Sequence, residues 1–295
     1  MGSSTVFSNL YGAKKIDKLK NSFFISSCLI GLLSLVINFL ALFFIDDILF
    51  LLKIPQEIWG DTKTYLQSIR KVPIIRLKRK HFHFDMNIVK MIGNNSILTS
   101  IQQSVMNLGI LMIQGLVNSF GVSVMAAFAA VVKIESFAYL PEQELGNAFS
   151  TFIAQNHGAK ERGRIRNGIR SAIKIITIYG VTVSALIILL AKPIMSIFID
   201  PNETEIIQIG IQYLFIVASF YCLIGYLFML YGLYRGIGKP GMSIILTVVS
   251  LGTRVILAYT LSSVPSIGLK GIWWAIPIGW ALADIIGFYR IKRSC

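Results

Sequence analysis

The sequence has 295 residues, of which 55% are hydrophobic and only 14% are charged, and its mean hydropathy is +0.69. Soluble globular domains carry about 25% charged residues, so this composition excludes a soluble domain and indicates a membrane protein. The net charge of +14 would suggest nucleic-acid binding in a soluble chain. Here the basic residues lie in short segments between apolar runs, as the positive-inside rule describes, and no nucleic-acid partner is expected.

Hydropathy predicts seven membrane-spanning segments. About 20 apolar residues suffice for a helix to cross the hydrocarbon core, and the backbone must satisfy its own hydrogen bonds there. We therefore predict an all-α polytopic membrane protein. The predicted spans are Phe23–Ile45, Ile92–Val117, Val122–Ala154, Ala172–Ala191, Ile206–Tyr234, Met242–Leu261 and Ile272–Tyr289.

Loop charges predict how the later spans are oriented. From the second span onward, basic connections (70–90 and 160–174) alternate with uncharged or acidic ones (118–121 and 200–205). The second to seventh spans should therefore form a six-helix bundle with both ends, including the C-terminus, in the cytoplasm. The first span has basic clusters on both sides, so either it is frustrated or neighbouring spans are missing.

Part of the chain repeats at an offset of 146 residues, with a register that holds for about 50 residues. The repeated pairs include Gly12-Ala13-Lys14 with Gly158-Ala159-Lys160, Asn21 with Asn167, and Pro55 with Pro201. A duplication in the same direction is typical of transporters whose halves are related by an axis along the membrane normal.

Four segments in the second part of the chain resemble the multidrug and toxic compound extrusion (MATE) family. They are KIESFAYLP at 133–141, LGNAFSTFIAQNHGA at 145–159, YGLYRGIGKP at 231–240 and GIWWA at 271–275. The resemblance implies two six-helix lobes around a central cavity, alternating access, and export of cationic or amphipathic small molecules across the cell membrane, driven by inward Na⁺ or H⁺.

The resemblance also implies a division of the chain. Residues 93–295 resemble a complete second lobe, and residues 71–92 a basic cytoplasmic linker. Residues 1–70 resemble a fragment of the first lobe, with the end of one helix, one full span and an amphipathic piece. The first-lobe helices without a counterpart leave open whether the chain transports alone or needs a missing lobe or partner subunit.

Ionisable side chains inside predicted spans are the main functional candidates, because each costs about 2.5–3.5 kcal/mol at the helix centre. Glu135, Tyr139 and Glu142 are spaced i, i+4, i+7 and share one helical face. Pro141 beside them removes a backbone hydrogen bond and marks a kink. A carboxylate in such surroundings can exchange protons or bind a hard cation. We expect Glu135, with Glu142 or Glu144, to couple ion movement to substrate release.

Structural pairing is the alternative for several of these charges. Glu135 would then pair with Lys133 or Arg254, while Glu142 and Glu144 would sit in a polar vestibule. Asp284 is expected to pair with Arg290 or to extend toward the interface.

The second span has a polar side, which lines the substrate cavity together with Tyr139 or forms hydrogen bonds to another helix. Its members are Gln103, Asn107, Gln114 and Asn118. Trp273 and Trp274 are expected in an interfacial aromatic belt.

The leading hypothesis is a MATE-type secondary active efflux transporter that exchanges drugs or xenobiotics for Na⁺ or H⁺. The alternatives are a non-transporting pseudo-transporter or membrane subunit, and a lipid-linked saccharide flippase. The three cysteines lack CxxC spacing, so no metal site is expected. No paired nucleophile and base and no cofactor motif is present, so we expect neither enzymatic activity nor a cofactor beyond the coupling ion. Membrane lipid and the exported compounds are the expected partners.

Overall fold

The structure is a computed structural model that describes residues 2–43 and 86–294. Every regular element in these ranges is an α-helix. The chain divides into two compact units, one formed by residues 16–92 and the other by residues 1–15 together with 93–295. In the smaller unit, the helix α2 (Ile16–Phe43) contains the predicted first span as far as Phe43.

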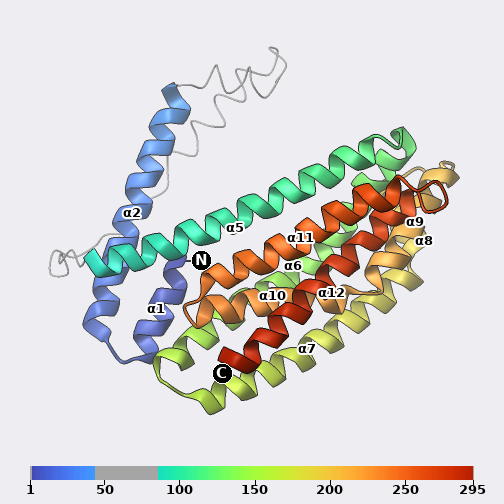
Figure 1. Ribbon diagram of the computed structural model, residues 1–295. Helices are drawn as coiled ribbons and strands as arrows, with labels where there is room; N and C mark the ends of the chain where they lie inside the picture. Colours follow the sequence, from blue (N-terminus) through green and yellow to red (C-terminus); the bar gives the residue numbers. More distant parts are fainter. Residues whose placement is uncertain (1, 44–85, 295) are drawn as a thin grey trace. The chain divides into compact units, whose positions relative to one another are not determined.

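The larger unit is a bundle of helices, which from α5 onward are joined by short turns (Figure 1). Its helices in chain order are α1 (Gly2–Gly12), α5 (Met86–Asn118, from Gly93 onward), α6 (Val122–Gly158), α7 (Arg162–Leu189), α8 (Ala191–Phe198), α9 (Thr204–Ala218), α10 (Tyr221–Gly236), α11 (Pro240–Ser262) and α12 (Leu269–Ser294).

Five helices of the described ranges are long and apolar enough to cross a membrane, namely α5, α6, α7, α11 and most of α12. A sixth span exists if α9 and α10 together form one. The predicted all-α polytopic fold is therefore confirmed.

The predicted span Ile206–Tyr234 is not one straight helix, because α9 and α10 meet at 53°. The Ser219 hydroxyl donates to the Phe215 carbonyl, with an O···O distance of 2.6 Å. A neighbouring helix also contributes, since the Ser184 hydroxyl of α7 donates to the Ala218 carbonyl. These side chains satisfy carbonyls at the break, as serine commonly does where a helix bends.

The helices α6 and α10 approach each other so closely that their backbones touch. A Cβ atom on Gly146 would lie 2.6 Å from the Phe228 carbonyl oxygen, and one on Gly232 would collide with the Gly146 carbonyl oxygen. Small residues at such crossings allow the close packing on which membrane bundles depend. This crossing fixes α10 beside the candidate carboxylates of α6.

Two corresponding positions of the predicted repeat have the same backbone geometry where α1 and α6 end. Lys14 and Lys160, which correspond at the offset of 146, both adopt left-handed backbone conformations, with φ of 57° and 61°. The next amide in each copy closes the same turn, with N···O distances of 3.0 Å for Lys15 to Leu10 and 2.9 Å for Glu161 to Asn156.

The division at residues 70 and 92 stays a prediction, because the boundary at 70 and the linker up to residue 85 lie outside the described residues. The described part shows that residues 1–15 belong to the same compact unit as residues 93–295. A fragment assigned by sequence to the first lobe thus packs on the predicted second lobe.

Candidate functional site

Glu135 of α6 lies against a cluster of aromatic side chains from neighbouring helices. The Tyr213 hydroxyl of α9 donates a hydrogen bond to Glu135 Oε2, with an O···O distance of 2.8 Å. The Tyr213 ring meets Trp273 of α12 edge to face, with centroids 4.7 Å apart. Phe128 of α6 stacks on Trp273 at 5.8 Å and meets Tyr213 edge to face at 5.9 Å, so the three rings form one cluster. In such low-dielectric surroundings, a hydrogen bond and a nearby charge act more strongly than in water.

Of the two bases considered as partners for Glu135, Arg254 is the one whose charge acts on the carboxylate. It lies on α11 and acts electrostatically on both Glu135 and Tyr213. Lys133 is exposed and lies over the Phe198 ring at 5.9 Å from its centroid. Among the described residues, no salt bridge joins Glu135 to either base. The structure therefore gives Glu135 a tyrosine as its direct partner and an arginine as a nearby charge.

Glu142 lies two helical turns further along α6 and is only 2% exposed. It contacts α10 at Gly225, where a Cβ atom would lie 2.8 Å from Glu142 Oε1. Its carboxylate oxygens have no hydrogen-bond partner among the described residues. Tyr221, the first residue of α10, acts electrostatically on both Glu135 and Glu142. The two carboxylates therefore belong to one site, around the bend between α9 and α10.

Two further candidates on α6 lie beside this site. Helix α6 continues through Pro141, and the Tyr179 hydroxyl of α7 donates to the Ala138 carbonyl at 3.0 Å, one turn earlier. Tyr139 is half-buried and packs on Phe228, with ring centroids 6.4 Å apart.

Glu144 is separate from the carboxylate pair. It is exposed and accepts a hydrogen bond from Asn147 Nδ2 at 3.2 Å. The Asn147 side-chain oxygen in turn accepts one from Arg235 of α10, also at 3.2 Å. Glu144 thus belongs to a polar chain between α6 and α10.

The polar side of the second predicted span forms hydrogen bonds within its own helix. Gln103 donates to Asn107 at 3.5 Å, and Gln114 donates to Asn118 at 3.0 Å. Both pairs are exposed, and among the described residues none of the four side chains bonds to another helix. The cavity-lining role of these residues stays a prediction.

Asp284 of α12 is 5% exposed, and among the described residues its carboxylate has no hydrogen-bond partner. It borders an apolar cavity of about 610 Å³ with Leu223 and Tyr226. Arg290, its expected partner, instead directs Nη1 toward the Met242 sulfur at 3.9 Å. The expected ion pair is therefore absent from the described part of the chain.

Sequence reasoning missed the aromatic partners of the carboxylates. Tyr213 is separated from Glu135 by 78 positions, and no local spacing signals the contact. Trp273 was expected at the membrane interface but is 1% exposed, whereas the neighbouring Trp274 is 44% exposed. A helix places adjacent residues about 100° apart, so one of two neighbouring tryptophans faces the core. Within the described ranges, no cluster of three His, Cys, Asp or Glu residues could hold a metal ion.

Comparison with known protein families gives a match over most of the chain. A sequence model of the MatE family matches residues 1–70 and 96–260. Related curated proteins include the probable multidrug resistance protein YoeA of Bacillus subtilis, which is 26% identical over 215 residues, covering 72% of this chain and 46% of YoeA. The FAD transporter of Shewanella oneidensis is 27% identical over 176 residues, covering 59% of this chain and 38% of that protein. The chain thus spans less than half the length of these relatives.

Solved structures share the fold. A MOP superfamily transporter from Pyrococcus furiosus, described as having a binding pocket of reversed polarity, aligns with a TM-score of 0.86 and 19% identity over 99% of this chain and 83% of that one. The outward-facing conformation of a multidrug resistance MATE family transporter aligns with a TM-score of 0.84 and 18% identity, over the same shares of the two chains.

Proposed function

Because this chain belongs to the MatE family of membrane transporters, we propose that it serves multidrug efflux by secondary active antiport. Cationic or amphipathic compounds leave the cell by alternating access in exchange for Na⁺ or H⁺. The protein lies in the cell membrane with its C-terminus in the cytoplasm, where the basic connections place it. The relatives named for multidrug resistance support this class of substrate.

The observation that carries the proposal is the hydrogen bond between Tyr213 and Glu135, at 2.8 Å, inside the helical bundle. A proton or Na⁺ at Glu135 competes with this bond for the carboxylate. Because Tyr213 lies on α9, the bond joins α6 to the helix that bends against α10. Ion binding at Glu135 therefore changes a contact between helices, as coupling requires. Glu142, which like Glu135 acts electrostatically on Tyr221, is the second carboxylate of the same site.

Two other functions stay open beside export by the chain alone. The chain spans less than half the length of its curated relatives, and the second candidate is a membrane subunit that does not transport by itself and works with a partner lobe or subunit. A lipid-linked saccharide flippase would carry an anionic cargo, which the carboxylates of α6 would repel.

The test is ethidium efflux from cells that express the chain with Glu135→Gln. The substitution keeps the side-chain size but removes the charge, so efflux should fall to the level of the empty vector. Glu144→Gln is the matched control, since it makes the same change on the same helix at an exposed position, and its efflux should equal that of the wild type.

Two results would contradict these proposals separately. Wild-type ethidium accumulation equal to that of the empty vector would overturn export by this chain alone. If the Glu135→Gln variant exported ethidium as fast as the wild type, with the same dependence on pH and Na⁺, the coupling role of Glu135 would be overturned.

A further inference from the structure

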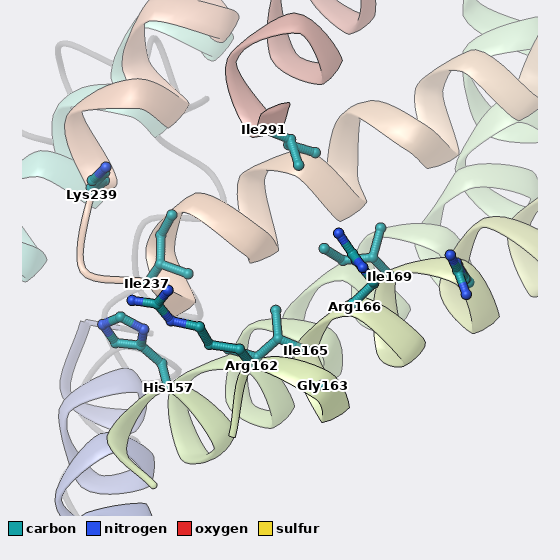
Figure 2. Close-up of a pocket in the computed structure, with 10 residues that line it drawn as sticks. His157, Arg162, Gly163, Ile165, Arg166, Ile169, Ile237, Lys239 and Ile291 are labelled. Atoms are coloured by element: carbon teal, nitrogen blue, oxygen red, sulfur yellow. The ribbon is translucent and has the colours of Figure 1, made fainter. Parts of the chain in front are cut away.

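A basic cavity of about 1010 Å³ lies where α6 ends, α7 begins and α10 turns into α11 (Figure 2). Its nitrogen-bearing side chains come from three separate segments, and none of the residues described as lining it is acidic. These residues are His157 of α6, Arg162, Arg166 and Arg170 of α7, and Lys239 of the α10–α11 turn. The cavity is distinct from the Glu135 site and shares no residue with it.

The three arginines lie on one face of α7, because they are spaced i, i+4, i+8. Like charges at this spacing destabilise a helix, and no carboxylate pairs with these arginines among the described residues. The positive-inside rule depends on how many basic residues lie near a span, and it does not require them to lie on one face of the helix. Arg164, for example, adds the same charge to the first turn of α7 but does not line the cavity. Membrane topology therefore does not explain this clustering.

Four isoleucines form the apolar part of the same cavity, namely Ile165, Ile169, Ile237 and Ile291. Figure 2 shows Ile165 between Arg162 and Arg166 on α7, and Ile169 beside Arg166 on the same helix. A soluble phosphate needs only the cationic part of such a site. A ligand with both a phosphate and an apolar portion would contact the whole lining.

The length of α7 places the cavity near the membrane surface. Its 28 residues extend over roughly 42 Å at 1.5 Å per residue, which exceeds the hydrocarbon thickness of about 30 Å. The first turns of α7, with the arginines, therefore reach the depth of the lipid headgroups. Basic pockets between spans at this depth suit anionic headgroups.

We propose that this cavity binds the phosphate group of an anionic phospholipid. The guanidinium groups of Arg162, Arg166 and Arg170 form charge-assisted hydrogen bonds to the phosphate oxygens, and the isoleucines contact the glycerol and the first acyl carbons. Because the lining comes from α6, α7, α12 and the α10–α11 turn, the bound lipid joins these segments and stabilises the bundle.

The experiment measures thermal unfolding of the purified full chain in detergent, with added dioleoyl phosphatidylglycerol. A ligand that binds only the folded state raises Tm, so this lipid should raise the wild-type Tm by several degrees, and zwitterionic dioleoyl phosphatidylcholine should not. Arg166→Gln and Arg170→Gln should each weaken the apparent affinity for phosphatidylglycerol at least tenfold. The matched control Arg164→Gln should respond like the wild type.

Three results would overturn the proposal. One is an equal Tm rise with phosphatidylglycerol and phosphatidylcholine. A second is the same phosphatidylglycerol response in Arg166→Gln, Arg170→Gln and Arg164→Gln. The third is a full Tm rise with inorganic phosphate alone and no further rise with the lipid, which would identify a soluble phosphate as the ligand. Size-exclusion chromatography verifies folding, and if one cavity variant misfolds, the other decides.

Discussion

Asp284 shows how much the location of a single charge matters in this bundle. A buried ionic or polar group without a hydrogen-bond partner destabilises the folded state. Asp284 is 5% exposed, lies beside an apolar cavity and has no hydrogen-bond partner among the described residues. The Glu135 carboxylate, by contrast, accepts a hydrogen bond from Tyr213.

Replacing Asp284 by leucine should therefore stabilise the protein, because it removes an unpartnered carboxyl group, keeps the same branching of the side chain and adds apolar volume beside the apolar cavity. We expect a gain of about 1–3 kcal/mol, or several degrees in Tm, measured by thermal unfolding in detergent. Asp200→Asn is the control, since Asp200 is exposed in the turn before α9 and its replacement should leave Tm unchanged. A lower Tm for Asp284→Leu would show that the carboxylate has a stabilising partner.

The sequence predicted candidate site residues only where the residue type was unusual for its position, as with an ionisable side chain inside a predicted span. Glu135 and Glu142 stand out because charges are rare within spans, and their spacing predicts that they share one face of α6. The partner Tyr213 lies on another helix, and the choice between Arg254 and Lys133 depended on how α8 and α11 pack. The expected pair of Asp284 and Arg290 followed from their nearness in sequence, but the Arg290 side chain points to Met242.

Among the elements, the bend between α9 and α10 is the clearest departure from the predicted spans. Residues 218–221 include neither proline nor glycine, and the hydropathy is continuous across them. The bend leaves the Ala218 carbonyl without its helical partner, and Ser184 of α7 supplies the hydrogen bond. Hydropathy locates apolar windows and their approximate ends, but it carries no information about a carbonyl satisfied by another helix.

Ser184→Ala should destabilise the bundle, because it leaves the buried Ala218 carbonyl without a hydrogen bond. The expected loss is about 1–3 kcal/mol, measured as a fall in the Tm of the purified chain. Thr182→Ala is the control on the same helix, because Thr182 is exposed and bonds only to the Ile178 carbonyl of its own helix, at 2.8 Å. Its effect should stay within about 0.5 kcal/mol. Equal Tm values for the two variants would show that Ser184 does not support the bend.

At the scale of the whole molecule, the repeat explains a contact that the order of spans does not. A Cβ atom on Gly12 would collide with the Gln155 carbonyl, and one on Gly158 with the Asn9 carbonyl. Asn9 and Gln155 are themselves 146 positions apart, so the crossing of α1 and α6 is reciprocal. The self-alignment predicted which residues correspond, but not that the corresponding residues touch, because an alignment carries no distance.

If α1 and α6 cross at these glycines, replacing either one by alanine should lower Tm, whereas alanine at an open helical position should raise it. Alanine normally stabilises a helix relative to glycine by about 0.5–1 kcal/mol, and Gly115→Ala in α5, where an added Cβ has nothing within 4 Å, should raise Tm. Gly12→Ala and Gly158→Ala should each lower Tm and cost about 1–3 kcal/mol of stability, because the new methyl group displaces a backbone carbonyl. The double variant should lose less stability than the sum of the two single losses, since either change disrupts the same crossing.

Thermal unfolding measures the stability of each variant, and limited proteolysis should show that α1 is cleaved faster in both single variants. A rise in Tm for Gly12→Ala would show that α1 does not pack on α6 at this crossing.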